Sequence, residues 1–187
     1  MLMKRFLKII THPYTALNAW KFSSWGNSTL RYPALKLKGL CYISVGDDTV
    51  LGKNIQLTAW DSFENQHFQP SITIGNGCVI RDNAHITAVN NITIGNNLLT
   101  GTNVLITDNS HGVGDKGQMN LPPNKRPLYS KGPVVIGNNV WLGNNVCVMP
   151  GVTIGDGAII GANAVVTHDI PANSIAAGIP ARIINQL

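Results

Sequence analysis

The sequence predicts an all-β protein built as a parallel β-helix of short strands. Aliphatic residues followed by glycine or another small or polar residue recur at every sixth position, in phrases such as "VVIGNN", "VTIGDG" and "AIIGAN". A period of six fits neither an α-helix, which repeats at about 3.6 residues, nor a simple strand, which repeats at about 2. Only 12% of the residues are charged, and glycine, asparagine, valine and isoleucine are abundant. These observations favour a coil of short strands joined by tight turns.

The repeat divides most of the chain into about five coils of three hexads each. Glycine, asparagine or aspartate usually follows the aliphatic position, and these residues tolerate the left-handed backbone conformation that a sharp corner requires. Residues 41–187 are therefore expected to form one β-helix domain with a C-terminal tail at residues 172–187. The aliphatic positions are Val45, Leu51 and Leu57, then Ile74, Ile80 and Ile86, then Ile94, Thr100 and Ile106, and finally Ile136, Leu142, Val148, Ile154, Ile160 and Val166.

Residues 1–40 contain no repeat and are expected to form a cap, in which "KRFLKII" begins an amphipathic helix. Further along the chain, two segments interrupt the repeat, at residues 59–73 and at residues 108–133. Long insertions in a regular rod are typically surface loops, and such loops often carry function. The longer segment is rich in glycine, proline and lysine, and is expected to protrude from the rod.

The composition excludes several classes of protein. The formal net charge is +5, yet no aromatic-rich basic motif or recognition-helix pattern is present, so nucleic acid is not an expected partner. The three cysteines have no CxxC spacing and fit a reducing compartment better than a disulfide framework. The chain shows no secretory signal and no run of about 18 apolar residues. We expect a cytoplasmic protein, and the basic, apolar stretch "MLMKRFLKII" indicates weak contact with a membrane surface.

A histidine, His111, stands where the repeat stops, in the stretch "GTNVLITDNSHG". After the loop come "VWLG", "MPGVTIGDGAIIGANAVVT" and finally "GIPARII". In this order the chain resembles the hexapeptide-repeat O-acetyltransferases, which include galactoside and maltose acetyltransferases and the enzymes that O-acetylate bacterial surface polysaccharides. The resemblance is strong over residues 70–187 and loose over residues 40–69. It implies a left-handed coil, a homotrimer with active sites between neighbouring subunits, and acetyl-CoA as the acyl donor without a metal.

The resemblance also implies catalytic roles. The histidine that matches His111 is the general base in the family, and a neutral imidazole can take the proton of a sugar hydroxyl near pH 7, with no acyl-enzyme required. The galactoside enzymes carry an asparagine thirty residues before this histidine. This chain has Arg81 there, so Asn83 is the candidate for stabilising the oxyanion. The group that orients His111 is Asp108, Asp115 or a backbone carbonyl.

Four further residues match positions that contact coenzyme A in the family. Trp141 in "VWLG" matches a tryptophan that lies along the pantetheine arm. Ala162 and Thr167 match positions whose backbone contacts the cofactor near the thiol arm and the adenine. Arg182 in "GIPARII" is a candidate phosphate partner, because a guanidinium pairs well with phosphate. Relatives often have a lysine where this chain has His168, so a lysine contact to the phosphates is lost or weakened here.

Together these motifs predict an acetyl-CoA-dependent O-acetyltransferase that acts on a saccharide hydroxyl, in the biosynthesis of a surface polysaccharide such as O-antigen, capsule or exopolysaccharide. Acetylation of a small free acceptor, such as a galactoside, maltose or an antibiotic, is the alternative. A zinc-dependent carbonic anhydrase needs three histidines, two of them five residues apart, and the five histidines of this chain offer no such pair. A rod without enzymatic activity needs neither "VWLG" nor "GIPARII". The basic loop after His111 is either a solvated surface or a cover that favours an acidic or phosphate-linked saccharide.

Overall fold

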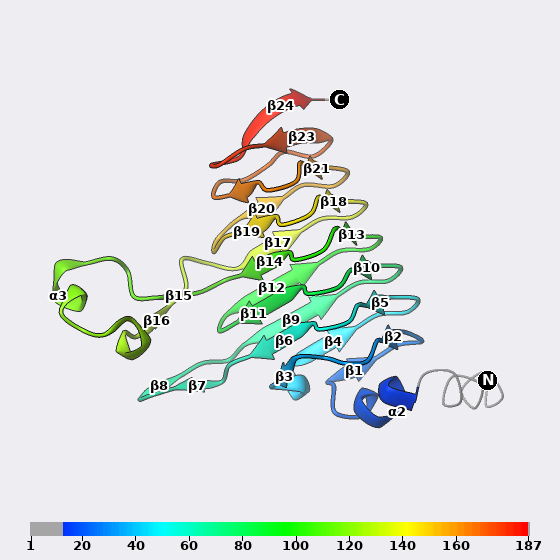
Figure 1. The fold of residues 1–187 in the computed structure, drawn as a ribbon, viewed down its shortest axis with the longest axis horizontal. Helices are drawn as coiled ribbons and strands as arrows, with labels where there is room; N and C mark the ends of the chain where they lie inside the picture. Colours follow the sequence, from blue (N-terminus) through cyan, green and yellow to red (C-terminus); the bar gives the residue numbers. More distant parts are fainter. Residues whose placement is uncertain (1–12, 187) are drawn as a thin grey trace.

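The computed structural model describes residues 13–186, which fold into a three-sided rod of stacked coils (Figure 1). Each coil contributes one short strand to each of three parallel sheets, which are named faces A, B and C. Face A contains β1 (Ser24–Trp25), β4 (Ile43–Val45), β9 (Ser71–Ile74), β12 (Asn91–Ile94), β17 (Val134–Ile136) and β20 (Thr153–Ile154). Face B contains β2 (Thr29–Leu30), β5 (Val50–Leu51), β10 (Val79–Ile80), β13 (Leu99–Thr100), β18 (Trp141–Leu142), β21 (Ile159–Ile160), β23 (Ser174–Ala177) and β24 (Arg182–Gln186), the last of which pairs antiparallel with β23. Face C contains β3 (Lys36–Lys38), β6 (Gln56–Ala59), β11 (His85–Ala88), β14 (Leu105–Thr107), β19 (Cys147–Val148) and β22 (Val165–Val166).

The repeating aliphatic positions form one continuous core, because the strands of successive coils are in register. Ile106 on β14 pairs with Ile86 on β11 and with Val148 on β19. All three side chains are fully buried, and burying one such side chain contributes roughly 1.5–3 kcal/mol. The hexad prediction is confirmed, since its aliphatic positions are the residues that fill the inside of the rod.

Asparagines mark the edge of the rod between faces B and C. Asn83, Asn103, Asn145 and Asn163 have φ angles of 62°, 58°, 58° and 61°, a left-handed conformation that asparagine tolerates better than most residues. Their side chains also bond to one another along the edge. Asn83 Nδ2 donates to Asn103 Oδ1 at 2.9 Å, and Asn103 Nδ2 donates to Asn145 Oδ1 at 3.0 Å. The ladder continues from Asn145 to Asn163 at 2.9 Å, so both backbone and side chain of each asparagine stabilise the corner.

The rod begins earlier than the sequence predicts. Strands β1, β2 and β3 form a complete coil inside the segment that was expected to be a cap. Trp25, Leu30 and Leu37 of this coil align with the core positions of the next one. They are five and seven residues apart, and this uneven spacing hides the coil from a pattern of period six. The described chain therefore has six complete coils, one more than predicted.

A short helix, α2 (Pro13–Ala19), packs against the first coil. The hydroxyl of Thr15 donates to Leu30 O at 3.0 Å and accepts from Leu30 N at 2.9 Å, which ties the helix to β2. A 3₁₀ turn, η1 (Leu40–Tyr42), leads into β4. The helix expected at "KRFLKII" lies outside the described residues. None of the helices in residues 13–186 is long and apolar enough to cross a lipid bilayer.

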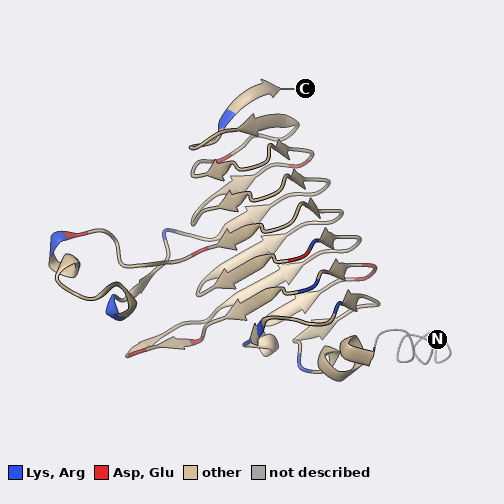
Figure 2. Cartoon of the chain, viewed as in Figure 1, with Lys and Arg blue, Asp and Glu red and all other residues tan. Residues whose placement is uncertain are grey.

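Two protrusions leave the rod at the edge where face C passes to face A (Figure 1). The first is a hairpin of β7 (Ser62–Phe63) and β8 (Gln66–His67). The second is a longer arm, which confirms the predicted protruding loop. It contains β15 (Ser110–His111), α3 (Lys116–Met119), η2 (Pro123–Lys125) and β16 (Leu128–Tyr129), and β15 pairs antiparallel with β16. Charged residues are sparse on the rod and more frequent on the arm (Figure 2).

Candidate functional site

His111 lies at the base of the arm, in β15, opposite Leu128 of β16. Its side chain is exposed, and among residues 13–186 its ring has no hydrogen-bond partner. The ring contacts the ring of Phe63 on the hairpin edge-on, with centroids 5.4 Å apart and an interplanar angle of 70°. The histidine is thus accessible to a ligand, and a side chain from another coil supports its ring.

Neither acid near His111 in the sequence orients its ring in this chain. Asp108 is fully buried, and its carboxylate accepts hydrogen bonds from the backbone N–H groups of Val89 and Asn90, each at 2.9 Å. Asp115 caps α3 by accepting from Gly117 N. Both carboxylates therefore have structural roles, and two of the three orienting groups that the sequence left open do not contact the histidine.

Asn83, the candidate for stabilising the oxyanion, belongs to the asparagine ladder. Its amide accepts from Asn54 Nδ2 at 3.2 Å and donates to Asn103 Oδ1 at 2.9 Å. The ladder runs along the edge between faces B and C, whereas His111 follows face C at its other edge. Strand β11 of face C separates the two edges, so a single chain does not bring Asn83 to His111.

Trp141 lies in β18 on face B, and its side chain is 50% exposed. It stands in a stripe of outward-facing apolar residues, because its register partners are Leu99 on one side and Ile159 on the other. Leu99 is itself 38% exposed. The stripe consists of Val50, Val79, Leu99, Trp141, Ile159 and Ile175, each paired with the next across face B. Face B thus presents an apolar surface on which Trp141 is the largest side chain.

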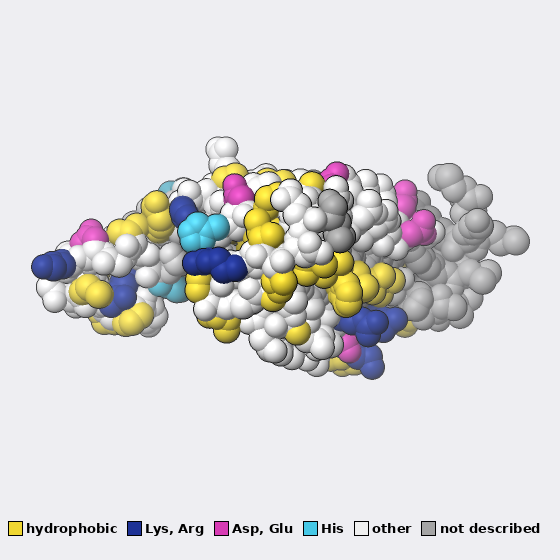
Figure 3. Space-filling view, turned by 90° about the horizontal axis from the view of Figure 1, so that it is seen from above, with side chains coloured by type: hydrophobic (Ala, Val, Ile, Leu, Met, Phe, Trp, Pro, Cys, Tyr) yellow, Lys and Arg dark blue, Asp and Glu magenta, His cyan; other side chains and the backbone are white. Residues whose placement is uncertain are grey.

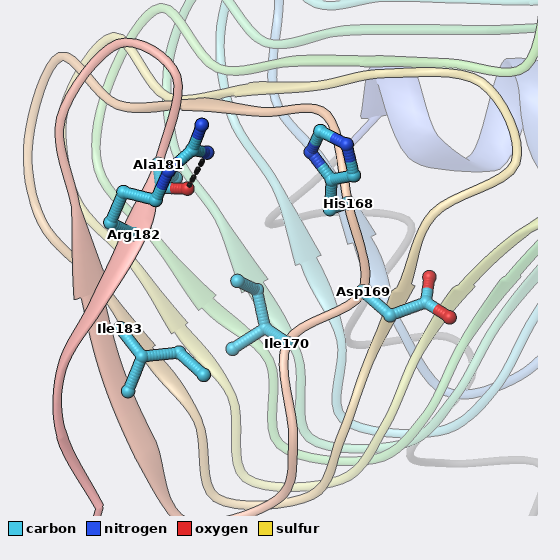
Figure 4. Close-up of a pocket in the computed structure, with 6 residues that line it drawn as sticks. All are labelled: His168, Asp169, Ile170, Ala181, Arg182 and Ile183. Atoms are coloured by element: carbon cyan, nitrogen blue, oxygen red, sulfur yellow. Dashed lines mark hydrogen bonds between the residues drawn. The ribbon is translucent and has the colours of Figure 1, made fainter.

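A pocket of about 360 Å³ lies at the C-terminal end of the rod, where β24 passes the turn that follows β22. The side chains of His168, Arg182, Ile170 and Ile183 are among those that line it (Figure 4). Asp169 is the acid in its lining, and its carboxylate accepts from Thr153 N at 2.7 Å. Seen from the C-terminal end, histidine and basic side chains lie next to each other on the side of the rod from which the arm extends (Figure 3).

Two predicted cofactor residues lie at opposite ends of β22. Thr167 follows the strand at the edge between faces C and A, and its hydroxyl lies 2.9 Å from His168 Nδ1. Ala162 precedes β22, at the edge between faces B and C. It packs closely on Gly143 of the coil below, because a Cβ atom added to Gly143 would lie 2.6 Å from the backbone nitrogen of Ala162. The structure therefore places Thr167 and His168 near the C-terminal end of the rod, on the same edge as His111 and two coils above it, and Arg182 of β24 reaches the same pocket as His168 from face B. Coils are about 5 Å apart, so this step is roughly 10 Å along the rod.

Known proteins share both the sequence pattern and the fold. The model of the bacterial transferase hexapeptide (six repeats) family matches residues 133–168. The protein WbbJ of Escherichia coli strain K12, which carries the name of a lipopolysaccharide biosynthesis O-acetyl transferase, is 37% identical over 148 residues, covering 77% of this chain and 71% of its own. A hexapeptide-repeat acetyltransferase of Vibrio cholerae, solved with acetyl coenzyme A, superposes with a TM-score of 0.62 at 25% identity, covering 94% of this chain and 76% of that one. A maltose O-acetyltransferase from Clostridium difficile 630 superposes with a TM-score of 0.55 at 31% identity, covering 90% and 71%.

The chain belongs to the hexapeptide-repeat transferases. It is therefore an enzyme of the acyltransferase class. Its fold is the left-handed parallel β-helix that the resemblance implied, built from the stacked coils described above.

Two residues near the histidine of this hexapeptide-repeat transferase were not found from the sequence. Phe63 contacts the His111 ring, and Gln66 bonds to the backbone of Leu128, the residue paired with His111. Both lie in the interruption at residues 59–73, which indicated only a surface loop. Nothing in the spacing of that segment shows that it folds back onto an arm that follows some forty residues later.

Proposed function

We propose that this transferase moves the acetyl group of acetyl-CoA directly to a saccharide hydroxyl. The observation that carries the proposal is the position of His111, which is exposed, has no hydrogen-bond partner within residues 13–186, and lies on the same edge of the rod as His168, a lining residue of the pocket that Arg182 also lines. An unpaired imidazole is free to accept the proton of an incoming hydroxyl. The relatives that carry the names of sugar and lipopolysaccharide acetyltransferases support this reaction class.

His111 acts in this reaction as a general base. Its unprotonated ring nitrogen accepts the proton of the saccharide hydroxyl while the oxygen of that hydroxyl forms a bond to the carbonyl carbon of the acetyl group. The bond from that carbon to the thiol sulfur then breaks, and the sulfur leaves with a proton returned from His111. The charge that develops on the carbonyl oxygen needs N–H donors. Asn83 was expected to supply one, and in a single chain its amide already has two partners in the ladder.

The residues present fit acetyl-CoA, which would supply the acetyl group as an activated thioester. Arg182 offers a planar guanidinium at the pocket, and such groups pair with phosphate by two parallel hydrogen bonds. His168 flanks the same pocket in place of the lysine that relatives often carry. Trp141 offers an exposed ring along which an apolar pantetheine chain would pack. Among residues 13–186 no group of three or more His, Cys, Asp and Glu side chains is arranged to bind a metal.

We propose a homotrimer with sites between subunits, and the places of these residues support it. Trp141 is on face B, whereas His111 is at the edge between faces C and A, so one chain does not present the two side chains to a single ligand. Face B of one subunit packed near that edge of its neighbour would bring them together. The apolar stripe around Trp141 supports such packing, because contiguous exposed apolar surface usually marks an interface.

The acceptor we propose is a precursor of a bacterial surface polysaccharide, on the basis of the 37% identity to WbbJ. The alternative is a small free sugar, which the likeness to a maltose acetyltransferase supports. We place the enzyme in the cytoplasm, where acetyl-CoA and the sugar precursors are made, with weak contact of its N-terminal segment to the inner membrane surface. That segment lies outside the described residues.

The proposal is tested by measuring the free thiol released from acetyl-CoA with and without saccharide acceptors. We expect acceptor-dependent release in the native protein and a loss of about 10²–10⁴-fold in His111→Ala, the usual contribution of a general base. Met119→Ala is the matched control, since Met119 is exposed on α3 of the same arm. Full turnover in His111→Ala would overturn the assignment of the base. Turnover with maltose or galactosides that matches turnover with polysaccharide precursors would favour the alternative acceptor.

A further inference from the structure

The hairpin and the arm leave the rod from different coils and then dock against each other. The hairpin follows β6 and the arm follows β14, with the coil that contains β11 between them. Figure 1 shows β7 and β8 extending on the same side of the rod as β15 and β16. Three contacts join the two protrusions, from Phe63, Glu64 and Gln66 of the hairpin.

The strongest of these contacts comes from Gln66. Its Oε1 accepts from Leu128 N at 2.7 Å, and its Nε2 donates to Leu128 O at 3.0 Å. One side-chain amide thus satisfies both backbone groups of a single residue, as a neighbouring strand would. These hydrogen bonds join residues 62 positions apart in the sequence.

Leu128 is the residue that faces His111 across the two-stranded arm. Gly112 N donates to Pro127 O at 2.8 Å, so the backbone hydrogen bonds between the two strands flank the pair formed by His111 and Leu128 and do not join its two residues. In such a pair the backbone groups of both residues point away from the partner strand, and the side chains lie at their closest. The backbone of Leu128 is therefore free to bond to Gln66, and this bond fixes the strand that supports His111.

Phe63 acts on the histidine itself. Its ring meets the His111 ring at an angle of 70° with centroids 5.4 Å apart, within the range of favourable edge-to-face aromatic contacts. The phenyl ring occupies one side of the imidazole and so restricts its rotation. The third contact, between Lys125 Nζ and Glu64 Oε1 at 3.0 Å, has both side chains more than half exposed, and contacts of that kind contribute little.

We infer that the β7–β8 hairpin is a clamp that positions the catalytic histidine, with Gln66 holding the arm and Phe63 holding the ring. This inference rests on the proposed function of His111. It accounts for how the ring is held when both nearby carboxylates are engaged elsewhere, Asp108 with the backbone of Val89 and Asp115 with α3. Gln66 and Phe63 are positioning residues, since neither is placed to exchange a proton with the substrate.

The experiment measures kcat and the KM for acetyl-CoA in Gln66→Leu and Phe63→Leu, together with the NMR signals of the His111 ring. We expect kcat to fall by roughly 10- to 100-fold, as misplacing a catalytic group by about 1 Å does, while the KM for acetyl-CoA stays within twofold. In Phe63→Leu the His111 ring signals should also shift, because the ring current of the phenyl group is lost. Gln69→Leu and Phe68→Leu are matched controls on the same segment, since in the described residues neither side chain makes a hydrogen bond or an aromatic ring contact with the arm.

The outcomes separate the clamp from the proposed function. A native kcat in both variants, with unshifted His111 signals in Phe63→Leu, would overturn the clamp. If His111→Ala keeps full turnover, the base is misassigned, and the NMR signals of Phe63→Leu still decide whether the hairpin holds the ring. Loss of activity in Gln69→Leu and Phe68→Leu equal to that in the test variants would also overturn it, because the effect would then belong to the fold of the whole hairpin.

Discussion

The carboxylate of Asp108 and the backbone N–H of Val89 are joined by a hydrogen bond of 2.9 Å beneath the base of the arm. The other carboxylate oxygen bonds to Asn90 N at the same distance. Asp108 thus joins the point at which the arm leaves the rod to the coil below it. Asp108 and Val89 are both buried, so the Val89 N–H has no water to replace the carboxylate.

Replacing Asp108 by alanine should therefore destabilise the protein. Hydrogen bonds to a charged acceptor contribute about 1.5–3 kcal/mol, and the Val89 N–H would be left buried without a partner. We expect the midpoint of urea denaturation to fall by a corresponding amount. Asp115→Ala, which removes an exposed cap on the arm, should change it much less. A native midpoint in Asp108→Ala would show that the buried carboxylate does not hold the coil.

Trp141 should matter for cofactor affinity. If its exposed ring packs along the pantetheine chain, Trp141→Ala should weaken CoA binding by roughly 5- to 20-fold, the loss expected from about 1–2 kcal/mol of apolar contact. Isothermal titration with CoA measures this directly. Trp20→Ala is the matched control, because Trp20 is 78% exposed directly after α2, at the far end of the rod. Equal CoA affinities of the native protein and Trp141→Ala would show that the tryptophan does not contact the cofactor.

Arg182 should bind a phosphate group. Charge-assisted hydrogen bonds from a guanidinium to phosphate are among the strong ones, so Arg182→Gln should weaken CoA binding by about 10-fold or more and reduce its dependence on salt concentration. Arg31→Gln, an exposed arginine in the first coil, should have native affinity. Unchanged affinity and unchanged salt dependence in Arg182→Gln would place the phosphates elsewhere.

The sequence predicts the rod well because each hexad contains its own information. An aliphatic residue such as Ile154 followed by Gly155 specifies both a buried strand position and the corner after it, and the same rule repeats from coil to coil. The first coil does not follow this rule, because its core-aligned positions Trp25, Leu30 and Leu37 are five and seven residues apart instead of six. The arm could be predicted because the repeat is absent from it, and His111 stands where the repeat stops.

The surroundings of His111 were less predictable, because they depend on contacts between distant segments. Phe63 and Gln66 belong to a hairpin whose sequence shows neither the repeat nor any link to the arm. Asp108 was a candidate for orienting the histidine by closeness in sequence alone, yet its side chain turns into the rod. Alternation along a strand sends neighbouring residues to opposite sides, so adjacency in sequence does not imply contact.

A final prediction concerns the response of stability to acid. His85 lies half-buried on face C, and burial lowers its pKa below the ordinary value, with the nearby charge of Lys36 lowering it further. The unfolded chain, with a histidine pKa of about 6.5, therefore binds a proton at a pH where the folded chain does not. As the pH falls below about 6.5, the difference in bound protons increasingly favours the unfolded chain. This destabilisation stops growing only below the pKa that His85 has in the folded chain. The contribution of neutral His85 is thus fully present at higher pH and is lost in mild acid.

We expect the melting temperature of the native protein to fall between about pH 7 and pH 5 more steeply than that of His85→Gln, which cannot be protonated. Lys36→Met should give an intermediate slope, because it removes the smaller of the two causes and leaves the burial. Melting curves recorded across this range in one buffer system provide the measurement. If His85→Gln melts with the same pH dependence as the native protein, another group governs the loss of stability in acid.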